Sequence, residues 1–479
     1  MTILTPANVA DVLKNDTKVK VAGVDADGVL RGKIMIKSKF LSSVETGFGF
    51  SSAVFGWDMH DMLYQGGVDC AAKNGTYADF TAYPDLSSFR RLPWEDDVPF
   101  FLLAFYSEGK PVAACPRGLL KGLTERLAQN SYKALAGVEL EFVNFQTPSE
   151  DGYSASANPR PNLAAFLSKN PPSAVRPLTG GMFGYSITRP MASKDYFYDI
   201  YSTAEKFRCD VEGWHTESGP GVYEAALAVR DVAEIADRVS LFKLLTRCVG
   251  IQHGATPCFM AKPLYGMPGS SGHIHLSLTD SAGKNLFARD EPNPSPLWPD
   301  LENVSDMGYH FLAGILDALP DIMPLLAPTV NSYKRFVENF WAPVWLTWGL
   351  EDRMASIRLI APPTCKPGAT RLEIRTPGAD VHPHYALSAL FLAGLRGVEE
   401  KLEVKVAPAS ARKPEDGRPE MLANSLEKAL ARFVAKESVA RKLLGEEFVE
   451  FYAASREHEL RQWREAVTDW EFKRYIETV

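Results

Sequence analysis

Residues 331–375 read NSYKRFVENFWAPVWLTWGLEDRMASIRLIAPPTCKPGATRLEIR and concentrate positive charge in one part of the chain. The stretch contains the basic residues Lys334, Arg335, Arg353, Arg358, Arg371 and Arg375, among others. Guanidinium groups donate several hydrogen bonds in a fixed plane, and a cluster of them favours the binding of carboxylates and phosphates. We therefore expect this stretch to hold anions.

The end of the stretch predicts a β-strand. Polar and apolar residues alternate in Arg371-Leu372-Glu373-Ile374-Arg375, and side chains two residues apart share one face of a strand. The two arginines and Glu373 then face one way, while Leu372 and Ile374 face the core. Taken alone, the pattern favours a solvent-facing edge strand with a ladder of opposite charges.

Two other segments show the same alternation, which changes that interpretation. Residues 137–145 (GVELEFVNF) and 273–278 (HIHLSL) each place polar side chains on one face. The glycine-rich approach to the second, MPGSSG at 267–272, exposes backbone amides to a ligand. An exposed strand face would also explain the first pattern, and satisfied core histidines the second. The polar faces consist of Glu139 and Glu141, and of His273, His275 and Ser277.

A turn within residues 215–225 (HTESGPGVYEA) brings two further carboxylates together. Glu217 and Glu224 lie on either side of Gly219-Pro220-Gly221, where the chain can reverse. Carboxylates with an occasional imidazole are ligands of Mg²⁺ or Mn²⁺, and such ions together with arginines neutralise a phosphoryl group in transfer. Five carboxylates and a histidine beside six basic residues therefore predict an ATP-dependent ligase.

The composition is that of a soluble globular protein. The chain has 479 residues, is 46% hydrophobic and 23% charged, and carries a net charge of −7. A mildly acidic chain without a basic tail predicts no nucleic-acid partner and no membrane partner. The six cysteines show no C-x-x-C spacing, and no apolar run reaches the roughly 18 residues of a membrane span. With no leader pattern at its start, we expect the protein to be cytoplasmic.

The chain is expected to divide into a small β domain and a larger α+β domain. Residues 19–36 predict a hairpin that turns at 25–28 (DADG), and the sequence changes character near residue 110. We expect domains at 1–110 and 111–479, with a long loop or flap at 148–175. Helical periodicity predicts helices over 117–135, 231–250, 303–319 and 382–401, and a charged helical tail from about 420.

Over nearly the whole chain these motifs resemble, in the right order, those of the type I glutamine synthetases. They are VDADGVLRGK (24–33), GVELEF (137–142), HTESGPGVYE (215–224), PGSSGHIHLS (268–277), NSYKRFVENFWAP (331–343), and EDRMASIRL and RLEIRTP (351–359 and 371–377). The terminal TDWEFKRYIE (468–477) resembles the ending of γ-glutamyl-amine members. The resemblance implies an α+β fold, with an N-terminal β-grasp domain and a catalytic domain whose curved antiparallel sheet is flanked by helices.

The resemblance also implies a role for each candidate residue. It implies sites for two to three Mg²⁺ or Mn²⁺ ions, formed by Glu141, Glu217 and Glu224 and by Glu139, His273 and Glu373. It implies that glutamate is positioned by Gly269, Arg335 and Arg375. It implies that ATP is bound by His275, Ser277, Arg353, Arg358 and Arg371, with Arg353 also catalytic. In the implied reaction, ATP phosphorylates the γ-carboxylate of glutamate and an amine then displaces phosphate to form an amide.

The departures from the family pattern lie where the amine would arrive. The family has an aspartate in an FDGSS segment and a glutamate in a GYEAP flap, and this chain has Gly49 and Trp341 at those positions. Both acids help to remove a proton from ammonium. An aromatic amine is already neutral near pH 7, and its ring can stack on Trp341 or Phe50. The chain thus resembles the γ-glutamylanilide and γ-glutamylalkylamide synthetases, and we expect an organic amine as substrate.

Two alternatives stay open. In a true glutamine synthetase that uses ammonia, Glu338 would supply the missing acid beside Trp341. A non-catalytic structural relative is the second, although the metal ligands and phosphate arginines are all present. Pro268 replaces an asparagine that helps to hold glutamate, which leaves a different acid substrate open. The resemblance further implies a homo-oligomer, a dodecamer of two stacked hexameric rings (or a decamer), with active sites shared between subunits.

Overall fold

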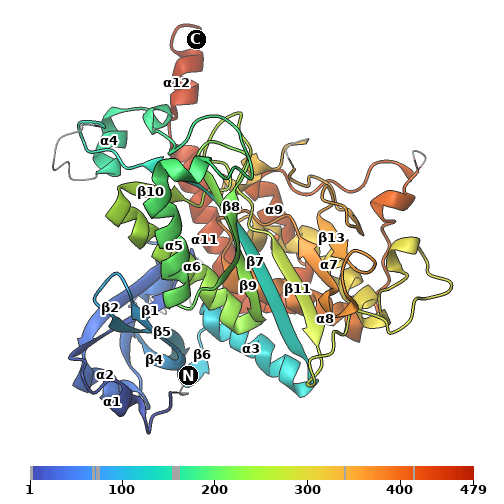
Figure 1. Ribbon diagram of the computed structural model, residues 1–479, viewed down its shortest axis with the longest axis horizontal. Helices are drawn as coiled ribbons and strands as arrows, with labels where there is room; N and C mark the ends of the chain where they lie inside the picture. Colours follow the sequence, from blue (N-terminus) through green and yellow to red (C-terminus); the bar gives the residue numbers. More distant parts are fainter. Residues whose placement is uncertain (1–3, 67–70, 72–75, 154–161, 339–340, 414–415) are drawn as a thin grey trace.

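The computed structural model describes residues 4–66, 71, 76–153, 162–338, 341–413 and 416–479, which build two sheets and the helices around them (Figure 1). The first sheet has the strand order β2-β1-β5-β4-β3, with β6 paired to β5. Its strands are β1 (Lys18–Val24), β2 (Leu30–Ile36), β3 (Phe48–Ser51), β4 (Asp79–Leu92), β5 (Val98–Ser107) and β6 (Lys110–Pro111), accompanied by the helices α1 (Val9–Val12) and α2 (Lys37–Ser43).

The hairpin predicted at residues 19–36 is confirmed. Strands β1 and β2 pair antiparallel, with Val24 opposite Leu30. Gly28 has a φ of 80°, a left-handed conformation that glycine adopts without a steric penalty, so the turn can close. The division of the chain near residue 110 stays a prediction, although β6 ends the first sheet at Pro111.

The second sheet is larger and carries the predicted polar faces. Its order is β12-β13-β14-β11-β7-β9-β8, with β10 paired to β7, and its neighbours are antiparallel except for β12 and β13. Its strands are β7 (Lys133–Gln146), β8 (Val211–Thr216), β9 (Val222–Asp231), β10 (Ala255–Cys258), β11 (Ile274–Thr279), β12 (Trp348–Leu350), β13 (Ile357–Ile360) and β14 (Arg371–Ile374). Since β14 lies between β13 and β11, the edge-strand interpretation of residues 371–375 is wrong.

Strand β7 shows why this sheet has a polar and an apolar face. Val138, Leu140 and Phe142 are buried, with exposed fractions of 2% or less, and they alternate with the half-buried Glu139 and Glu141. Burying one such apolar side chain stabilises the fold by about 1.5–3 kcal/mol, so the register that turns them toward the helices is strongly favoured. The carboxylates are thereby held on the opposite face.

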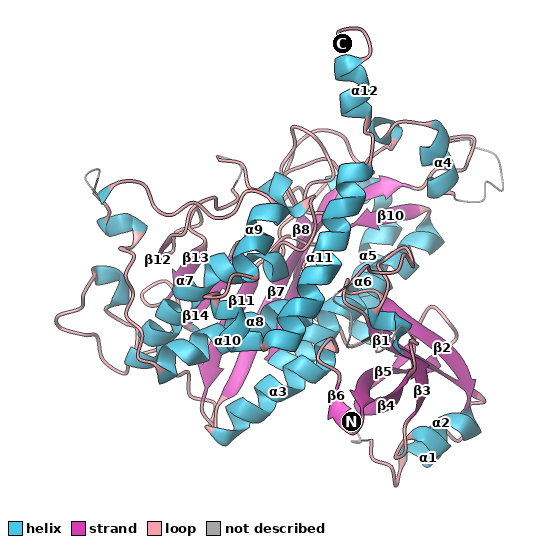
Figure 2. Ribbon diagram, turned by 180° about the vertical axis from the view of Figure 1, so that it is seen from behind, coloured by secondary structure: helices cyan, strands magenta, loops and turns pink. Residues whose placement is uncertain are grey.

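Helices cover the apolar face of the second sheet (Figure 2). Phe142 of β7 lies 6.2 Å from Phe242 of α6, measured between ring centroids. The helices of this part are α3 (Pro116–Gln129), α4 (Leu163–Lys169), α5 (Lys194–Lys206), α6 (Val232–His253), α7 (Asp306–Leu326), α8 (Pro383–Glu399), α9 (Leu426–Phe433), α10 (Val439–Leu444), α11 (Glu446–Glu465) and α12 (Asp469–Tyr475). No helix among the described residues is both long and apolar enough to cross a bilayer.

Helices are present at the predicted positions, but their first and last residues differ from the predicted ones. Helix α6 begins after Asp231, whose carboxylate accepts the backbone N–H of Ala233 at 3.0 Å. Helix α3 stops at Gln129, earlier than expected, because β7 already begins at Lys133. The segment 148–175 is not a loop throughout, since it contains α4; residues 154–161 lie outside the described part.

Candidate active site

Three adjacent strands bring a first group of candidate metal ligands together. Glu139 lies on β7, Glu373 on β14, and His273 just before β11, which pairs with both strands. The Nδ1 atom of His273 lies 3.2 Å from Glu139 Oε2 and 3.6 Å from Glu373 Oε1. Each of the three residues offers one ligand atom within 4.8 Å of the others. The grouping expected from the sequence therefore exists in the fold.

His273 is suited to metal ligation in its neutral form. Burial lowers the pKa of His273 to about 4, so its imidazole carries no charge at pH 7. Its Nε2 atom is buried and has no hydrogen-bond partner among the described residues. The nitrogen that faces the two carboxylates is Nδ1, and this arrangement fits a divalent cation, because a cation would take the lone pair of the neutral imidazole and offset the negative charge.

A second group lies at the hairpin between β8 and β9. Ligand atoms of His215, Glu217 and Glu224 lie within 4.8 Å of one another, with His215 Nε2 at 3.9 Å from Glu224 Oε2. Glu141 faces Glu224 across the β7–β9 pair, and its Oε2 accepts the backbone N–H of Ser271 at 2.6 Å. His215 therefore adds a candidate ligand that we did not predict, although it stands in the same motif, two residues before Glu217.

Negative charge is crowded at this second group. Burial, together with the neighbouring carboxylate of Glu141, raises the pKa of Glu224 to about 9. Burial likewise raises the pKa of Glu141, to which the charge of Glu217 contributes. These carboxyl groups resist ionisation because they are buried and lie close together. Their ionisation becomes favourable when a divalent cation is bound between them. The residues present fit a metal.

Arginines surround the first group on the side of β13. Arg358 Nη1 donates to Glu373 Oε2 at 3.0 Å, and Arg375 donates to Glu373 Oε1. Burial opposes the ionisation of Glu373, but the positive charge of the neighbouring Arg375 holds its pKa below the usual value. Arg358 also donates to Glu351 Oε2 at 3.0 Å. Glu373 is thus kept as a carboxylate in a buried position.

Arg335 is buried beside Gly269, as the predicted glutamate site requires. Its two Nη atoms donate to the carbonyl oxygens of Thr376 and Arg375, each at 3.0 Å. A Cβ atom on Gly269 would lie 2.8 Å from Arg335 Cγ and 2.6 Å from the carbonyl oxygen of Ala261. Only glycine leaves room for the Arg335 side chain at this place.

A cavity of about 410 Å³ opens beside Glu139 and collects three of the residues expected to bind ATP, His275, Ser277 and Arg371. His275 Nε2 lies 3.1 Å from Glu139 Oε1, and its Nδ1 accepts Arg371 Nε at 3.2 Å. Arg353, which is exposed, and Arg358 lie outside the residues that line this cavity.

The residues expected on the amine side lie at the surface of the chain. Trp341 is 65% exposed and does not point into the core, and Glu338 is exposed as well; Asn339 and Phe340 lie outside the described residues. Phe50 is partly buried against the core of the first sheet. A Cβ atom on Gly49 would lie 2.4 Å from Asp79 Oδ2. A carboxylate of β4 thus lies beside the position at which the family aspartate is missing.

Tyr185 is a further aromatic group at the second metal group, and sequence reasoning missed it. Its ring stacks on His215, with centroids 4.5 Å apart and planes inclined by 27°. Its backbone N–H donates to the carbonyl oxygen of Thr216 at 2.7 Å, which fixes this part of the loop to β8. Tyr185 remains 68% exposed, so its outer ring face is free to meet a ligand. The aromatic run at 182–185 (MFGY) was the available signal.

Comparisons with known proteins agree on the family. The model of the glutamine synthetase catalytic domain matches residues 113–475. The chain is 39% identical to type-1 glutamine synthetase 2 of Dictyostelium discoideum over 98% of this chain and 87% of that protein. It is 33% identical to the glutamate–isopropylamine ligase of a Pseudomonas species, covering 97% and 96%. The solved GmaS–ADP complex superimposes with a TM-score of 0.78 at 25% identity, covering 98% and 99%. The chain therefore belongs to the glutamine synthetase family, whose members are ATP-dependent carbon–nitrogen ligases.

Proposed function

We propose that the protein joins the γ-carboxylate of glutamate to an organic amine at the expense of ATP, through a γ-glutamyl phosphate. Two features that occur together carry this proposal. The candidate metal ligands Glu139, His273 and Glu373 lie close together, and the residues expected near the amine include Trp341 and Gly49 in place of two acids. The first feature supports phosphoryl transfer, and the second supports a substrate other than ammonia.

In this proposal the two groups of ligands hold two to three Mg²⁺ or Mn²⁺ ions. Glu139, His273 and Glu373 form one site, and Glu217, Glu224 and Glu141, with His215, form the other. When bound, such ions neutralise the charge of the transferring phosphoryl group. The chain's own part is to keep Glu373 ionised through Arg358 and Arg375 and to keep His273 neutral through burial.

The other candidate residues, including those of the arginine-rich stretch, bind either ATP or the acid substrate in this proposal. His275, Ser277 and Arg371 bind the nucleotide in the 410 Å³ cavity, while Arg353 and Arg358 act on its phosphates. Gly269, Arg335 and Arg375 hold the acid substrate, where the buried guanidinium of Arg335 pairs with a carboxylate. A guanidinium that burial deprives of water gains most from such a partner.

An organic amine is supported by the aromatic groups on the amine side. Trp341 exposes most of its ring, and Tyr185 exposes one face beside the second metal group. Apolar substituents gain free energy by leaving water for such surfaces, whereas ammonium has none. Relatives named glutamate–isopropylamine ligase and γ-glutamylethanolamide synthetase, 33% and 30% identical, point the same way.

Ammonia is the second candidate, and one observation favours it. Asp79 places a carboxylate oxygen beside Gly49, where it would take part in removing a proton from ammonium or from a protonated alkylamine. The 39% identity to a type-1 glutamine synthetase is in line with this candidate. Glu338 is a further acid on the same segment as Trp341.

The proposal extends to assembly and location. By likeness to the family we propose a homo-oligomer, a dodecamer of two hexameric rings, in which a small domain at 1–110 completes the site of a neighbouring catalytic domain at 111–479. We propose a cytoplasmic enzyme with no nucleic-acid or membrane partner. Size-exclusion chromatography with light scattering tests the assembly, and a mass close to that of a single chain would contradict it.

The reaction is tested by measuring glutamate-dependent release of phosphate from ATP with ammonia, alkylamines, polyamines and anilines in separate assays. The proposal predicts faster release with at least one organic amine than with ammonia at equal concentration. Faster release with ammonia than with every organic amine would favour a glutamine synthetase. No release with any of them, by a protein that is folded and loaded with Mg²⁺ or Mn²⁺, would favour a structural role.

A further inference from the structure

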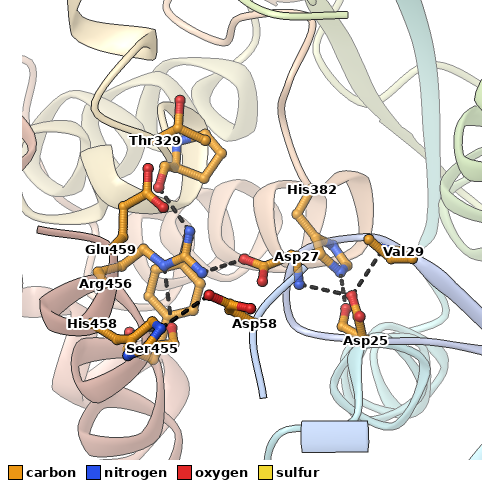
Figure 3. A network of polar contacts seen from close by, with 12 residues as sticks. Asp25, Asp27, Val29, Asp58, Thr329, His382, Ser455, Arg456, His458 and Glu459 are labelled. Carbon is orange, nitrogen blue, oxygen red and sulfur yellow. Dashed lines mark hydrogen bonds and ion pairs between the residues drawn. The ribbon is translucent and has the colours of Figure 1, made fainter. Parts of the chain in front are cut away.

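The turn Asp25–Gly28 of the first sheet is held by hydrogen bonds and reaches toward the helices that cover the second sheet (Figure 3). Asp25 Oδ1 accepts the backbone N–H groups of Asp27 at 3.0 Å and Val29 at 2.8 Å, and Asp25 Oδ2 accepts Arg31 Nε at 2.9 Å. The Nε2 atom of His382, which precedes α8, lies 3.0 Å from the carbonyl oxygen of Asp25. The position of this turn is therefore fixed from both sides.

The turn ends in a buried ion pair between Asp27 and Arg456 of α11 (Figure 3). The two side chains are 4% and 3% exposed, and Tyr64 donates its hydroxyl to the second oxygen of Asp27 at 3.3 Å. A buried charge is stable only when it is paired and hydrogen-bonded, so neither partner can leave without a large cost. The pair links the motif VDADGVLRGK to the C-terminal helices.

Arg456 reaches a second segment at the same time. Its Nη1 donates to the carbonyl oxygen of Pro328 at 2.8 Å, and Glu459, one turn along α11, accepts the backbone N–H of Val330 at 3.4 Å. A guanidinium donates in two directions from one rigid plane, which an ammonium group on a flexible stem does less well. Arg456 thus fixes the distance between Asp27 and Pro328.

The segment that follows Pro328 leads directly to Arg335. Thr329 and Ser332 donate their hydroxyls to the same oxygen of Asp380, at 3.0 Å and 2.6 Å. The short helix Ser332–Arg335 begins at this point, and its last residue donates to the carbonyl oxygens of Arg375 and Thr376. A displacement of Pro328 would therefore be carried into the Arg335 side chain.

We propose that Arg456 is a positioning residue that ties Arg335 to the first sheet, so that the Asp27 turn sets the place of the acid substrate. The proposal rests on the proposed function, in which Arg335 holds that substrate. It gives the VDADG motif a role within its own chain. Arg456 does not touch the reacting atoms and acts only through the segment 328–335.

The experiment compares Arg456→Met and Arg456→Lys with a control on the same helix, Arg464→Met. Arg464 pairs with Glu427 at the surface, so its loss removes an exposed ion pair and leaves the segment 328–335 untouched. For each protein we would measure kcat, KM for the acid substrate, KM for ATP, and backbone hydrogen exchange by mass spectrometry. Asp27→Asn keeps an oxygen at the turn and serves where Arg456→Met does not fold.

We expect Arg456→Met to raise KM for the acid substrate about tenfold, Arg456→Lys to raise it less, and both to leave KM for ATP within about twofold. Amide exchange should rise in 329–336 but not in β11 or β14, and Arg464→Met should match the wild type. If Arg456→Met lowers only the amount of folded protein and leaves KM for the acid substrate unchanged, the proposal is overturned. If the wild type turns over no acid at all, the proposed function fails, and the exchange pattern alone still decides whether Arg456 holds the segment.

Discussion

Arg358 and Glu373 face each other across the β13–β14 pair, and Arg358 Nη1 donates to Glu373 Oε2 over 3.0 Å. The contact joins the arginine-rich stretch to the carboxylate of Glu373, whose Oε1 atom lies 3.6 Å from Nδ1 of His273. One interaction therefore connects the proposed anion-binding half of the site with the proposed metal-binding half.

Replacing Arg358 by methionine should damage both halves. The buried carboxylate of Glu373 would lose a charged donor, which costs about 1.5–3 kcal/mol of unfolding free energy, and Arg375 would remain as its partner. We expect activity to fall at least about a hundredfold, because the guanidinium that we propose to act on the ATP phosphates is lost as well. Chemical denaturation and initial rates of phosphate release measure the two effects. Activity within a few-fold of wild type would contradict the role given to Arg358.

Metal binding at the second group should release protons. Because the pKa of Glu224 is raised to about 9, its carboxyl is mostly protonated at pH 7.5 and must lose that proton when a cation binds. Affinity for Mn²⁺ at this site should therefore rise as pH increases toward 9, by up to about tenfold per pH unit. Titration calorimetry in two buffers with different ionisation heats measures the released proton.

The matched control for this prediction is Glu224→Gln, in which no proton is available at that position. We expect the variant to bind Mn²⁺ more weakly and to release about one proton fewer. His273 should contribute no proton release near pH 7, since its pKa of about 4 leaves it neutral before the metal binds. Equal proton release by wild type and variant would show that Glu224 is ionised in the metal-free protein.

Gly269→Ala should disturb the acid substrate through Arg335. The added Cβ would lie 2.8 Å from Arg335 Cγ and 2.6 Å from a backbone oxygen that cannot move easily. We expect a destabilisation of about 1–3 kcal/mol and a raised KM for the acid, with KM for ATP little changed. Gly122→Ala in α3 is the control, because nothing lies within 4 Å of its added Cβ. Identical kinetics for the two variants would argue against a close approach at Gly269.

Trp341→Glu should shift the choice of amine. The substitution removes an aromatic surface that is 65% exposed and restores an acid at the position where the family carries one. We expect the ratio of rates with organic amine and with ammonia to fall more than about tenfold, since both apolar contact and proton removal change in the same direction. Trp341→Phe keeps a ring and should keep the preference. A ratio that stays constant in both variants would remove Trp341 from the amine site.

Much of the catalytic sheet could be predicted because strand periodicity is simple. The alternation around Glu139, His273 and Glu373 determines which side chains share a face, and three such strands lie side by side in the structure. Sequence motifs in order also suffice to identify the family. The end of α3 and the presence of α4 were harder to predict from the sequence. The end of a helix such as α3 depends on competition with the element that follows it in the chain.

The parts that escaped prediction depend on contacts across strands and loops. Tyr185 meets His215 only because a loop is fastened to Thr216, and Asp79 lies beside Gly49 only because of the β3–β4 register. Glu141 turns one oxygen to the N–H of Ser271, which no local pattern shows. The pair of Asp27 and Arg456 joins residues at opposite ends of the chain.

The most direct test of the proposed substrate class is a competition in one vessel. The wild-type protein would be supplied with glutamate, ATP, Mg²⁺ and Mn²⁺, together with ammonia and a set of alkyl and aromatic amines at equal concentrations, and the products identified by mass spectrometry. The proposal predicts a γ-glutamyl amide of an organic amine as the main product. Glutamine as the main product would contradict it and identify the protein as a glutamine synthetase.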